Sequence, residues 1–422
     1  MNRSLIQDEI KVRAVGGWKL KILLLCWEYP PNVVGGLSRH VHGLGVHMAN
    51  QGHEVHILTA GNGNLPSEEI VDDVRIHRVT PINDLDDDFL SWVGGLNLAM
   101  AFKAEMLSDE INFDLIHAHD WLIGAAAIHL KNSLSIPLLT TIHATEHGRS
   151  NGTLNQWQKF IHEKECQLIE HSDHIIVCSE YMKETLLSVF AAANEPIAVI
   201  PNGIDEPIVK FRAGDLFPEL NGKKFIFSVG RMVKEKGFET IIEAAEISRE
   251  TNQDYFFLIG GKGPMLDSYQ KMITEKDLQD YISFTGYLSD EQKNALLADC
   301  ELAVFPSLYE PFGIVALEAM VHGKATIVSN TGGLKGIIKH EYSGLLMEPG
   351  DARSMLEQIA FLSHHPRMSA EIGNNGRDVV KSLYGWKRIA CETARVMEDV
   401  VLKSRINEEM ELENQMIRRY GK

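Results

Sequence analysis

The chain has 422 residues, of which 44% are hydrophobic and 23% are charged, and this composition excludes a disordered or collagen-like protein. At roughly 150 residues per domain, the length predicts two or three domains with large apolar cores. Lys plus Arg is 41 and Asp plus Glu is 58, and the resulting net charge of −17 argues against nucleic acid and anionic membranes as partners.

The first half of the chain is predicted to be an α/β domain. The apolar run Leu20–Trp27 predicts a strand, Gly35-Gly36 a loop, and the apolar spacing from Leu37 to Met48 a helix. The run Glu54–Thr59 predicts a second strand, parallel to the first. Further elements are predicted as strands at Asp114–His117, Pro137–Ile142, His174–Cys178 and Ala198–Ile200, and as a helix at Trp121–Lys131.

The same pattern restarts in the second half of the chain. The apolar run Phe225–Val229 leads through Gly230 and Gly237 into an apolar-periodic helix, so we predict two Rossmann-like α/β domains that face a central cleft. The predicted division is residues 1–205, residues 206–385, and a C-terminal helix with a charged tail at 386–422. Further strands are predicted at Tyr255–Ile259, Ile282–Thr285, Leu302–Phe305 and Ala325–Ser329.

The cysteines and the apolar segments indicate in which cellular compartment the protein is expected. Five cysteines lie far apart with no C-x-x-C pair, which favours reduced thiols and a cytoplasmic protein. Residues Met1–Trp18 have no apolar core of the kind found in secretion signals, and the apolar window Phe89–Leu107 is interrupted by glycines and a lysine. We therefore expect neither a secretion signal nor a membrane span.

Two carboxylates flank a helix start in the second domain. Glu310-Pro-Phe-Gly follows a predicted strand, and the helix that starts after Gly313 carries Glu318. The positive end of that helix can face a diphosphate. Eight residues of helix span about 12 Å, so Glu318 can reach ribose hydroxyls while Glu310 contacts a sugar. A helix-terminal carboxylate with an unrelated surface glutamate would give the same pattern.

Two further loops after strands carry cations. In Gly230 to Gly237, Arg231 and Lys236 can neutralise the charge that builds up on a diphosphate leaving group, although a solvated loop is the alternative. The loop Gly260-Gly261-Lys262-Gly263 is a weaker candidate. Neither loop matches a Walker P-loop.

The first domain offers glycines and histidines. Gly35-Gly36 opens a helix, so its amides can approach phosphate or sugar. His119, Asp120 and Trp121 follow one strand and His143 ends the next, so these side chains are expected to point into one cleft. His117, His119, His143 and His147 could instead hold a metal ion, as could the Asp84-Leu-Asp86 triplet. We expect that the histidines are ordinary cleft residues, that the acidic triplet lies in a solvated loop, and that no metal is bound.

Together these segments resemble the GT-B glycosyltransferases, specifically the retaining group that includes glycogen synthases, sucrose synthases and many sugar transferases of family 4. The resemblance covers about Lys19 to Glu398. Its motifs are W-E-Y-P-P-x-x-x-G-G-L at Trp27–Leu37, H-A-H-D-W at His117–Trp121, P-N-G-I-D at Pro201–Asp205, G-R-x-x-x-x-K-G at Gly230–Gly237, and the pair Glu310 and Glu318.

The resemblance implies specific roles for these residues. It implies a nucleotide sugar bound mainly by the second domain, an acceptor bound mainly by the first, and a C-terminal helix that crosses back onto the first domain. The expected catalytic residues are His143, Arg231, Lys236 and Glu310. The expected donor-binding residues are Gly35, Gly36, Arg231, Lys236, Gly261, Phe312, Gly313, Ile314 and Glu318, with His119, Asp120 and Trp121 in the acceptor and sugar cleft.

The predicted reaction is transfer of glucose from UDP- or ADP-glucose to the non-reducing end of an α-1,4-glucan, as in glycogen synthases, without a resident cofactor. Val33-Val34 before Gly35, and Phe312 in E-P-F-G, depart from the common bacterial synthases, which have Lys-x-Gly-Gly and E-P-C-G. Another sugar or a lipid or small-molecule acceptor therefore stays open, as do a nucleotide-sugar epimerase of the same fold, a dinucleotide oxidoreductase and a non-catalytic glucan-binding protein. The sequence leaves the oligomeric state open.

Overall fold

The computed structural model describes residues 18–61, 63–83, 88–190, 192 and 195–420. The predictions made for the first 17 residues and for Asp84-Leu-Asp86 lie outside these residues. The chain divides into two compact units, each described by itself here. Unit 1 comprises residues 1–177, 185–200 and 386–422, and unit 2 comprises residues 178–184 and 201–385.

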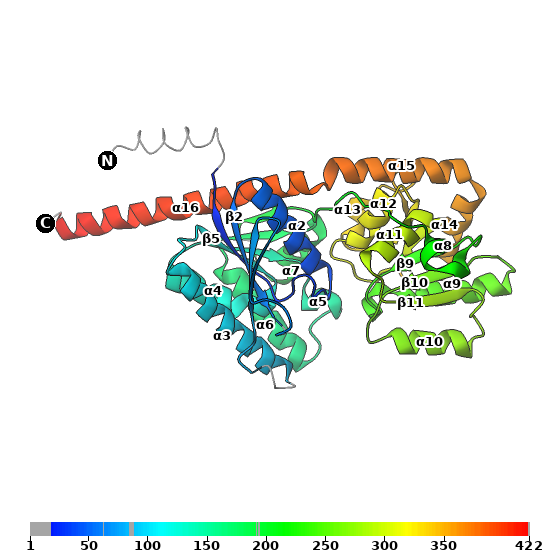
Figure 1. Ribbon diagram of the computed structural model, residues 1–422, viewed down its shortest axis with the longest axis horizontal. Helices are drawn as coiled ribbons and strands as arrows, with labels where there is room; N and C mark the ends of the chain where they lie inside the picture. Colours follow the sequence, from blue (N-terminus) through cyan, green and yellow to red (C-terminus); the bar gives the residue numbers. More distant parts are fainter. Residues whose placement is uncertain (1–17, 62, 84–87, 191, 193–194, 421–422) are drawn as a thin grey trace. The chain divides into compact units, whose positions relative to one another are not determined.

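Unit 1 is built on an eight-stranded sheet of order β3-β4-β2-β1-β5-β6-β7-β8 (Figure 1). All neighbouring strands pair in parallel except β3 and β4. The strands are β1 Lys21–Leu25, β2 Glu54–Ala60, β3 Glu68–Val71, β4 Val74–Val79, β5 Leu115–His119, β6 Leu138–Ile142, β7 His174–Val177 and β8 Ile197–Val199. The helices are α2 Gly36–Asn50, α3 Phe89–Ser108, η1 Trp121–Ile123, α4 Gly124–Leu134, α5 Glu146–Arg149, α6 Gln156–His171, α7 Glu180–Val189 (in unit 1 from residue 185) and α16 Trp386–Tyr420.

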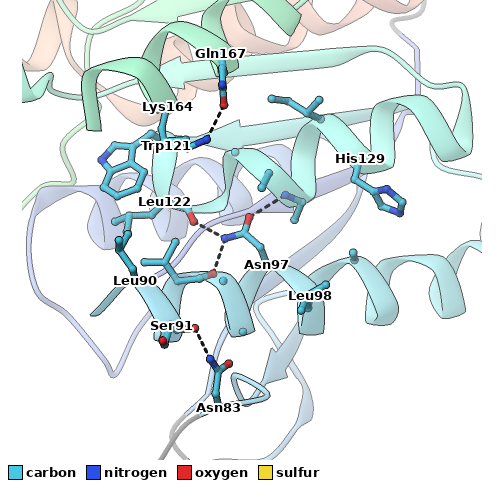
Figure 2. A pocket seen from close by; sticks show the side chains of 18 of the residues that line it. Asn83, Leu90, Ser91, Asn97, Leu98, Trp121, Leu122, His129, Lys164 and Gln167 are labelled. Carbon is cyan, nitrogen blue, oxygen red and sulfur yellow. Dashed lines mark hydrogen bonds between the residues drawn. The ribbon is translucent and has the colours of Figure 1, made fainter. Parts of the chain in front are cut away.

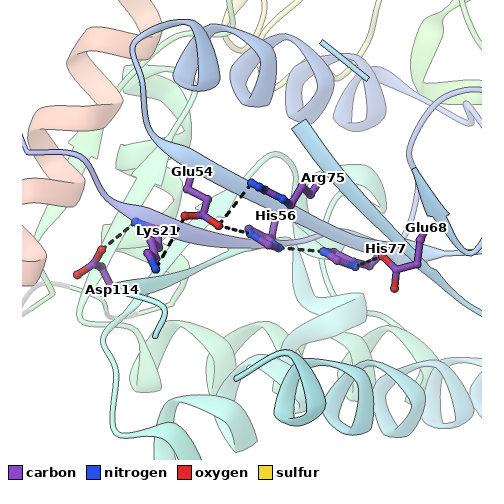
Figure 3. A network of polar contacts seen from close by, with 7 residues as sticks. All are labelled: Lys21, Glu54, His56, Glu68, Arg75, His77 and Asp114. Atoms are coloured by element: carbon purple, nitrogen blue, oxygen red, sulfur yellow. Dashed lines mark hydrogen bonds and ion pairs between the residues drawn. The ribbon is translucent and has the colours of Figure 1, made fainter. Parts of the chain in front are cut away.

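The β3-β4 hairpin at one edge of this sheet was not predicted. Its turn, Asp72-Asp73, has positive φ at both residues (50° and 62°), a conformation that Asp tolerates better than most residues. The hairpin supports a chain of polar contacts across the edge: Glu54 Oε1 lies 3.1 Å from Nε2 of His56, and Nδ1 of His56 lies 2.9 Å from Nε2 of His77 (Figure 3). Glu68 extends these contacts, with Oε2 2.5 Å from Nδ1 of His77 and Oε1 paired with Lys103.

The last helix of the chain packs against α2 in unit 1. Trp386, at its start, is buried, and a Cβ at Gly43 of α2 would lie 2.3 Å from the indole ring. Gly43 is therefore needed because the indole occupies the space of a side chain. Ile389, Met397 and Val401 continue the buried stripe of α16 at helical spacing.

Unit 2 is built on a six-stranded parallel sheet of order β11-β10-β9-β12-β13-β14 (Figure 1). The strands are β9 Ile226–Val229, β10 Phe257–Gly260, β11 Ile282–Gly286, β12 Leu302–Phe305, β13 Thr326–Ser329 and β14 Leu345–Met347. The helices are α8 Ala213–Leu216, η3 Pro218–Leu220, η4 Lys234–Lys236, α9 Phe238–Glu250, α10 Leu266–Glu275, α11 Asp290–Asp299, α12 Ile314–Val321, α13 Leu334–Ile337, α14 Ala352–His364 and α15 Pro366–Leu383.

The predicted α/β class with two Rossmann-like sheets is confirmed, and the edge strand β14 is a further element that was not predicted. The unit boundaries differ in detail from the predicted ones. Residues 178–184 group with unit 2, where Ser179 Oγ donates to the carbonyl of Pro311 at 2.7 Å. Residues 201–205 do so as well, since Ile204 bridges to Gly385. Among the described helices, none is long and apolar enough to cross a membrane.

Candidate active site

The candidate residues lie where the strand order of each sheet reverses. In unit 1 the reversal falls between β1 and β5, and in unit 2 between β9 and β12. Loops that leave the carboxyl ends of such strands diverge and leave a crevice in which open α/β sheets bind ligands. The loops in question are those after β1, β5 and β6 in unit 1 and those after β9 and β12 in unit 2.

Lys236 and Glu310 meet at the unit 2 reversal. Nζ of Lys236, in the turn after β9, lies 2.6 Å from Oε2 of Glu310, in the loop after β12. Ser307 Oγ also donates to Oε2 of Glu310, at 3.2 Å. The side chain of Glu310 is 9% exposed and that of Lys236 is 23% exposed. The structure thus joins two residues that the sequence places 74 positions apart.

The backbone of the two loops is also joined. The amides of Leu308 and Tyr309 both donate to the carbonyl of Glu235, at 2.9 and 3.2 Å. Gly237 has φ of 66°, and a Cβ there would lie 2.1 Å from the carbonyl oxygen of Pro306, so only glycine fits this approach. Arg231 is half-exposed and pairs with Glu235 at 3.1 Å. Both predicted cations therefore lie on a loop of fixed shape.

The helix predicted after Gly313 is present and starts at the expected residue. Gly313 is the N-cap of α12, with φ of 114° and no side-chain cap, so the first amides of the helix have no intrahelical acceptor. Ile314 is the first residue of the helix, and Phe312 before it is buried.

Glu318, the predicted ribose ligand, is nearly buried in α12 and pairs with Lys293 of α11. The partner Lys293 was not predicted.

Two of the predicted donor-binding glycines, Gly261 and Gly35, donate their backbone amides to acceptors within the protein. The amide of Gly261 donates to the carbonyl of Gly286 at 2.7 Å, and the residue has φ of 135°. The amide of Gly35 donates at 3.0 Å to Oε2 of Glu28, which also accepts from Val34. Glu28 is buried, and burial raises the pKa of its carboxyl. A phosphate would have to replace Glu28 to use the Gly35 amide, whereas Gly36 stands at the first position of α2.

His143 lies in a cluster of three imidazoles in unit 1. Nε2 of His143, after β6, is 3.0 Å from Nδ1 of His119, at the end of β5. The ring of His40, from α2, lies with its centroid 4.8 Å from that of His143. Burial, with the charge of Arg149, lowers the pKa of His143 to about 3, and burial also holds the pKa of His119 well below its usual range. The imidazoles of His119 and His143 are therefore neutral at pH 7.

Asp120 holds the backbone beside this cluster. Its φ of 61° turns the chain at the end of β5, and its Oδ1 accepts the amide of His143 at 2.7 Å. Burial raises the pKa of Asp120 to about 6, so it is mostly ionised at neutral pH. Asp120 therefore acts on His143 through the backbone.

The same cluster is the best metal-ligand candidate in the described part of the chain. One ligand nitrogen from each of His40, His119 and His143 lies within 4.8 Å of the others. His117 lies beside this cluster, with its ring centroid 4.3 Å from that of His119, and its Nε2 pairs with Thr141 at 2.7 Å. Neutral imidazoles suit a transition metal, but the charge of Arg149 acts on the same cluster and opposes a cation there.

Of the predicted site residues, Trp121 lines a pocket in unit 1 that neither His119 nor Asp120 lines. The turn at Asp120 places Trp121 in η1, where it lines a pocket of about 890 Å³ among α3, α4 and α6 (Figure 2). The polar groups of this pocket are paired with one another: Lys164 Nζ donates to Gln167 at 3.0 Å, and Asn97 bonds the carbonyl of Leu122 at 2.8 Å. The pocket therefore offers few groups to sugar hydroxyls.

The fold has two Rossmann-like units. Unit 2 places two cations, a carboxylate and the uncapped N-terminus of a helix at the point where its strand order reverses, and this combination defines a GT-B glycosyltransferase. The family model "Glycosyltransferase Family 4" matches residues 34–206, and "Glycosyl transferases group 1" matches residues 217–379. An uncharacterized glycosyltransferase of Methanocaldococcus jannaschii is 33% identical over 387 residues, 89% of this chain and 97% of the relative. The chain belongs to the family 4 glycosyltransferases and is an enzyme of this class.

Two further similarities concern named synthases. A glycogen synthase of Mycobacterium tuberculosis is 32% identical over 396 residues, 89% of this chain and 94% of that protein. The structure of a sucrose-phosphate synthase from Thermosynechococcus elongatus superposes with a TM-score of 0.80 at 25% identity, covering 91% of this chain and all of that one.

Proposed function

We propose that the chain is a retaining glucosyltransferase that moves glucose from UDP- or ADP-glucose to the non-reducing end of an α-1,4-glucan. The name of the M. tuberculosis relative supports the glucan acceptor, because that similarity runs along nearly the whole of both proteins. The observation that carries the proposal is the Lys236–Glu310 pair beside the open end of α12.

In this proposal, unit 2 stabilises the leaving group. Loss of glucose from the donor leaves charge on a nucleoside diphosphate, and fixed cations with backbone amides aimed at that charge lower the barrier. Lys236 and Arg231 supply the cations, and the amides after Gly313 supply the helix end. The Lys236–Glu310 contact keeps the ammonium in place before the donor arrives.

The carboxylates serve recognition in this proposal. Glu310 contacts the sugar and Glu318 contacts the ribose. The ribose then replaces part of the contact between Glu318 and Lys293. His143 keeps the role that the resemblance gives it, near the transferred sugar. No covalent nucleophile is assigned: the acceptor attacks the same face that the diphosphate leaves, and the departing phosphate takes the acceptor proton.

The test is a donor panel of UDP-glucose, ADP-glucose, GDP-mannose and UDP-N-acetylglucosamine, each with and without glycogen, with nucleotide release as the readout. The proposal expects glycogen-dependent release from a glucose donor and an α-linked product by proton NMR. Release with another sugar only would overturn the glucose assignment, and epimer formation without acceptor would identify an epimerase. A β-linked product would overturn retention.

A further inference from the structure

The segment that carries His143 has little regular structure of its own. Strand β6 ends at Ile142, and α5, which begins at Glu146, is only four residues long. The amides of His143 and Ala144 are accepted by Asp120, and the amide of Glu146 is accepted by Oε1 of Glu165 at 2.8 Å. Two carboxylates from other elements therefore hold this segment.

Glu165 holds the segment 143–146 from a buried position, which is unfavourable for a carboxyl group. It lies in the middle of α6 and is 2% exposed, and Oε2 accepts no hydrogen bond within the described part of the chain. That oxygen lies 3.9 Å from Nδ1 of His162. A buried carboxyl group with one oxygen that accepts no hydrogen bond destabilises the fold unless the group is protonated, and such a group calls for a functional explanation.

We propose that Glu165 is a positioning residue for His143: by accepting the amide of Glu146 it fixes, with Asp120, the segment 143–146 and so the place of the His143 imidazole. The inference rests on the proposed function for its catalytic consequence. Thr145 closes the arrangement from within the segment, since its Oγ1 accepts the amide of Gly148 at 3.2 Å. Nothing in the sequence motifs singled out Glu165.

The protonation of Glu165 gives the arrangement a pH dependence. Burial raises the pKa of Glu165 to about 8, so the carboxyl is neutral at pH 7. The charged and titratable groups that act on it are Asp120 at the end of β5, Glu146 and Arg149 on α5, and His162 on α6. Above pH 8 its ionisation places a second carboxylate charge near Asp120, and repulsion then disturbs the segment that both groups hold.

Three variants separate positioning from simple packing. Glu165→Gln keeps an acceptor for the Glu146 amide and cannot ionise, so we expect kcat within about threefold of wild type at pH 7 and loss of the alkaline limb near pH 8. Glu165→Ala removes the acceptor, and we expect kcat to fall about 10- to 100-fold, the scale of a small misplacement of a reacting group, with donor KM nearly unchanged. Glu170→Gln, exposed on the same helix, is the matched control and should behave as wild type.

A measurement without substrate keeps this inference separate from the proposed function. His143 itself stays neutral far below pH 7, so a change in its NMR resonance near pH 8 reports a neighbouring group. We expect that change in wild type and in Glu170→Gln, and not in Glu165→Gln. A resonance change that persists in Glu165→Gln, or a wild-type kcat in folded Glu165→Ala, would overturn the positioning role. Absence of transfer from every donor, with the NMR change intact, would overturn only the proposed function.

Discussion

Replacing Lys236 by Ala removes one of the two cations that the proposed mechanism aims at the leaving diphosphate. Removal of one fixed donor from a developing anion costs about 3 to 4 kcal/mol. The side chain of Lys236 is 23% exposed, so solvent screens it partly and the lower end applies. About 3 kcal/mol corresponds to a decrease of roughly 150-fold in kcat.

Loss of stability has to be distinguished from this loss of rate. Lys236→Ala leaves Glu310 nearly buried without its ammonium partner, and we expect a loss of roughly 1 to 2 kcal/mol in unfolding free energy. The double variant with Glu310→Gln removes the unpaired charge, so it should recover stability without recovering rate. Lys234→Ala, exposed in the same turn, is the matched control. Nucleotide release within about threefold of wild type in folded Lys236→Ala would refute the reasoning.

Three further predictions concern binding and stability. Glu318→Gln should weaken nucleotide binding by about 10- to 100-fold, as expected for a hydrogen bond to a charged group, and an unchanged Kd by calorimetry would contradict the ribose role. Trp386→Ala should lower the unfolding free energy by about 3 to 5 kcal/mol because it empties the space beside Gly43. Leu412→Ala, at an exposed position of the same helix, should change the unfolding free energy by less than about 0.5 kcal/mol. Similar melting temperatures for the two variants would count against the packing of α16. Burial lowers the pKa of many described histidines, among them His53 to about 4, and the unfolded chain binds their protons below pH 6.5. The raised pKa values of Glu28, Asp120 and Glu165 act in the opposite sense, but these carboxyls are fewer, so stability should fall as pH drops from about 6.5 to 4. A flat melting temperature over that range would be the contrary result.

Local sequence patterns predicted the central elements of both sheets. Apolar runs followed by glycine and then by apolar residues at helical spacing gave β1 with α2, β9 with α9, and β12 with α12, because these strands are buried on both faces. Three strands were missed: the edge strand β3 is largely exposed, the edge strand β14 has only three residues, and β4 lies between β3 and β2 in the same hairpin. The Asp72-Asp73 turn between alternating residues was the available signal for the hairpin.

The residues missed at the site are those whose partners come from distant parts of the chain. Glu28, His40 and Glu165 each look like ordinary polar residues of a loop or a helix, and only the fold shows that all three are buried or nearly so. Trp121 has a neighbourhood that its motif did not indicate. It belongs to the H-A-H-D-W motif, and it lines a pocket among α3, α4 and α6 that no other predicted site residue lines.

The most direct test of the central claim is an experimental structure of the protein with bound UDP or ADP. The account predicts the diphosphate at the N-terminus of α12, within hydrogen-bond distance of the Lys236 ammonium, the Arg231 guanidinium and the amides that follow Gly313. A nucleotide bound elsewhere, with Arg231 and Lys236 turned toward solvent and no phosphate near Gly313, would contradict it.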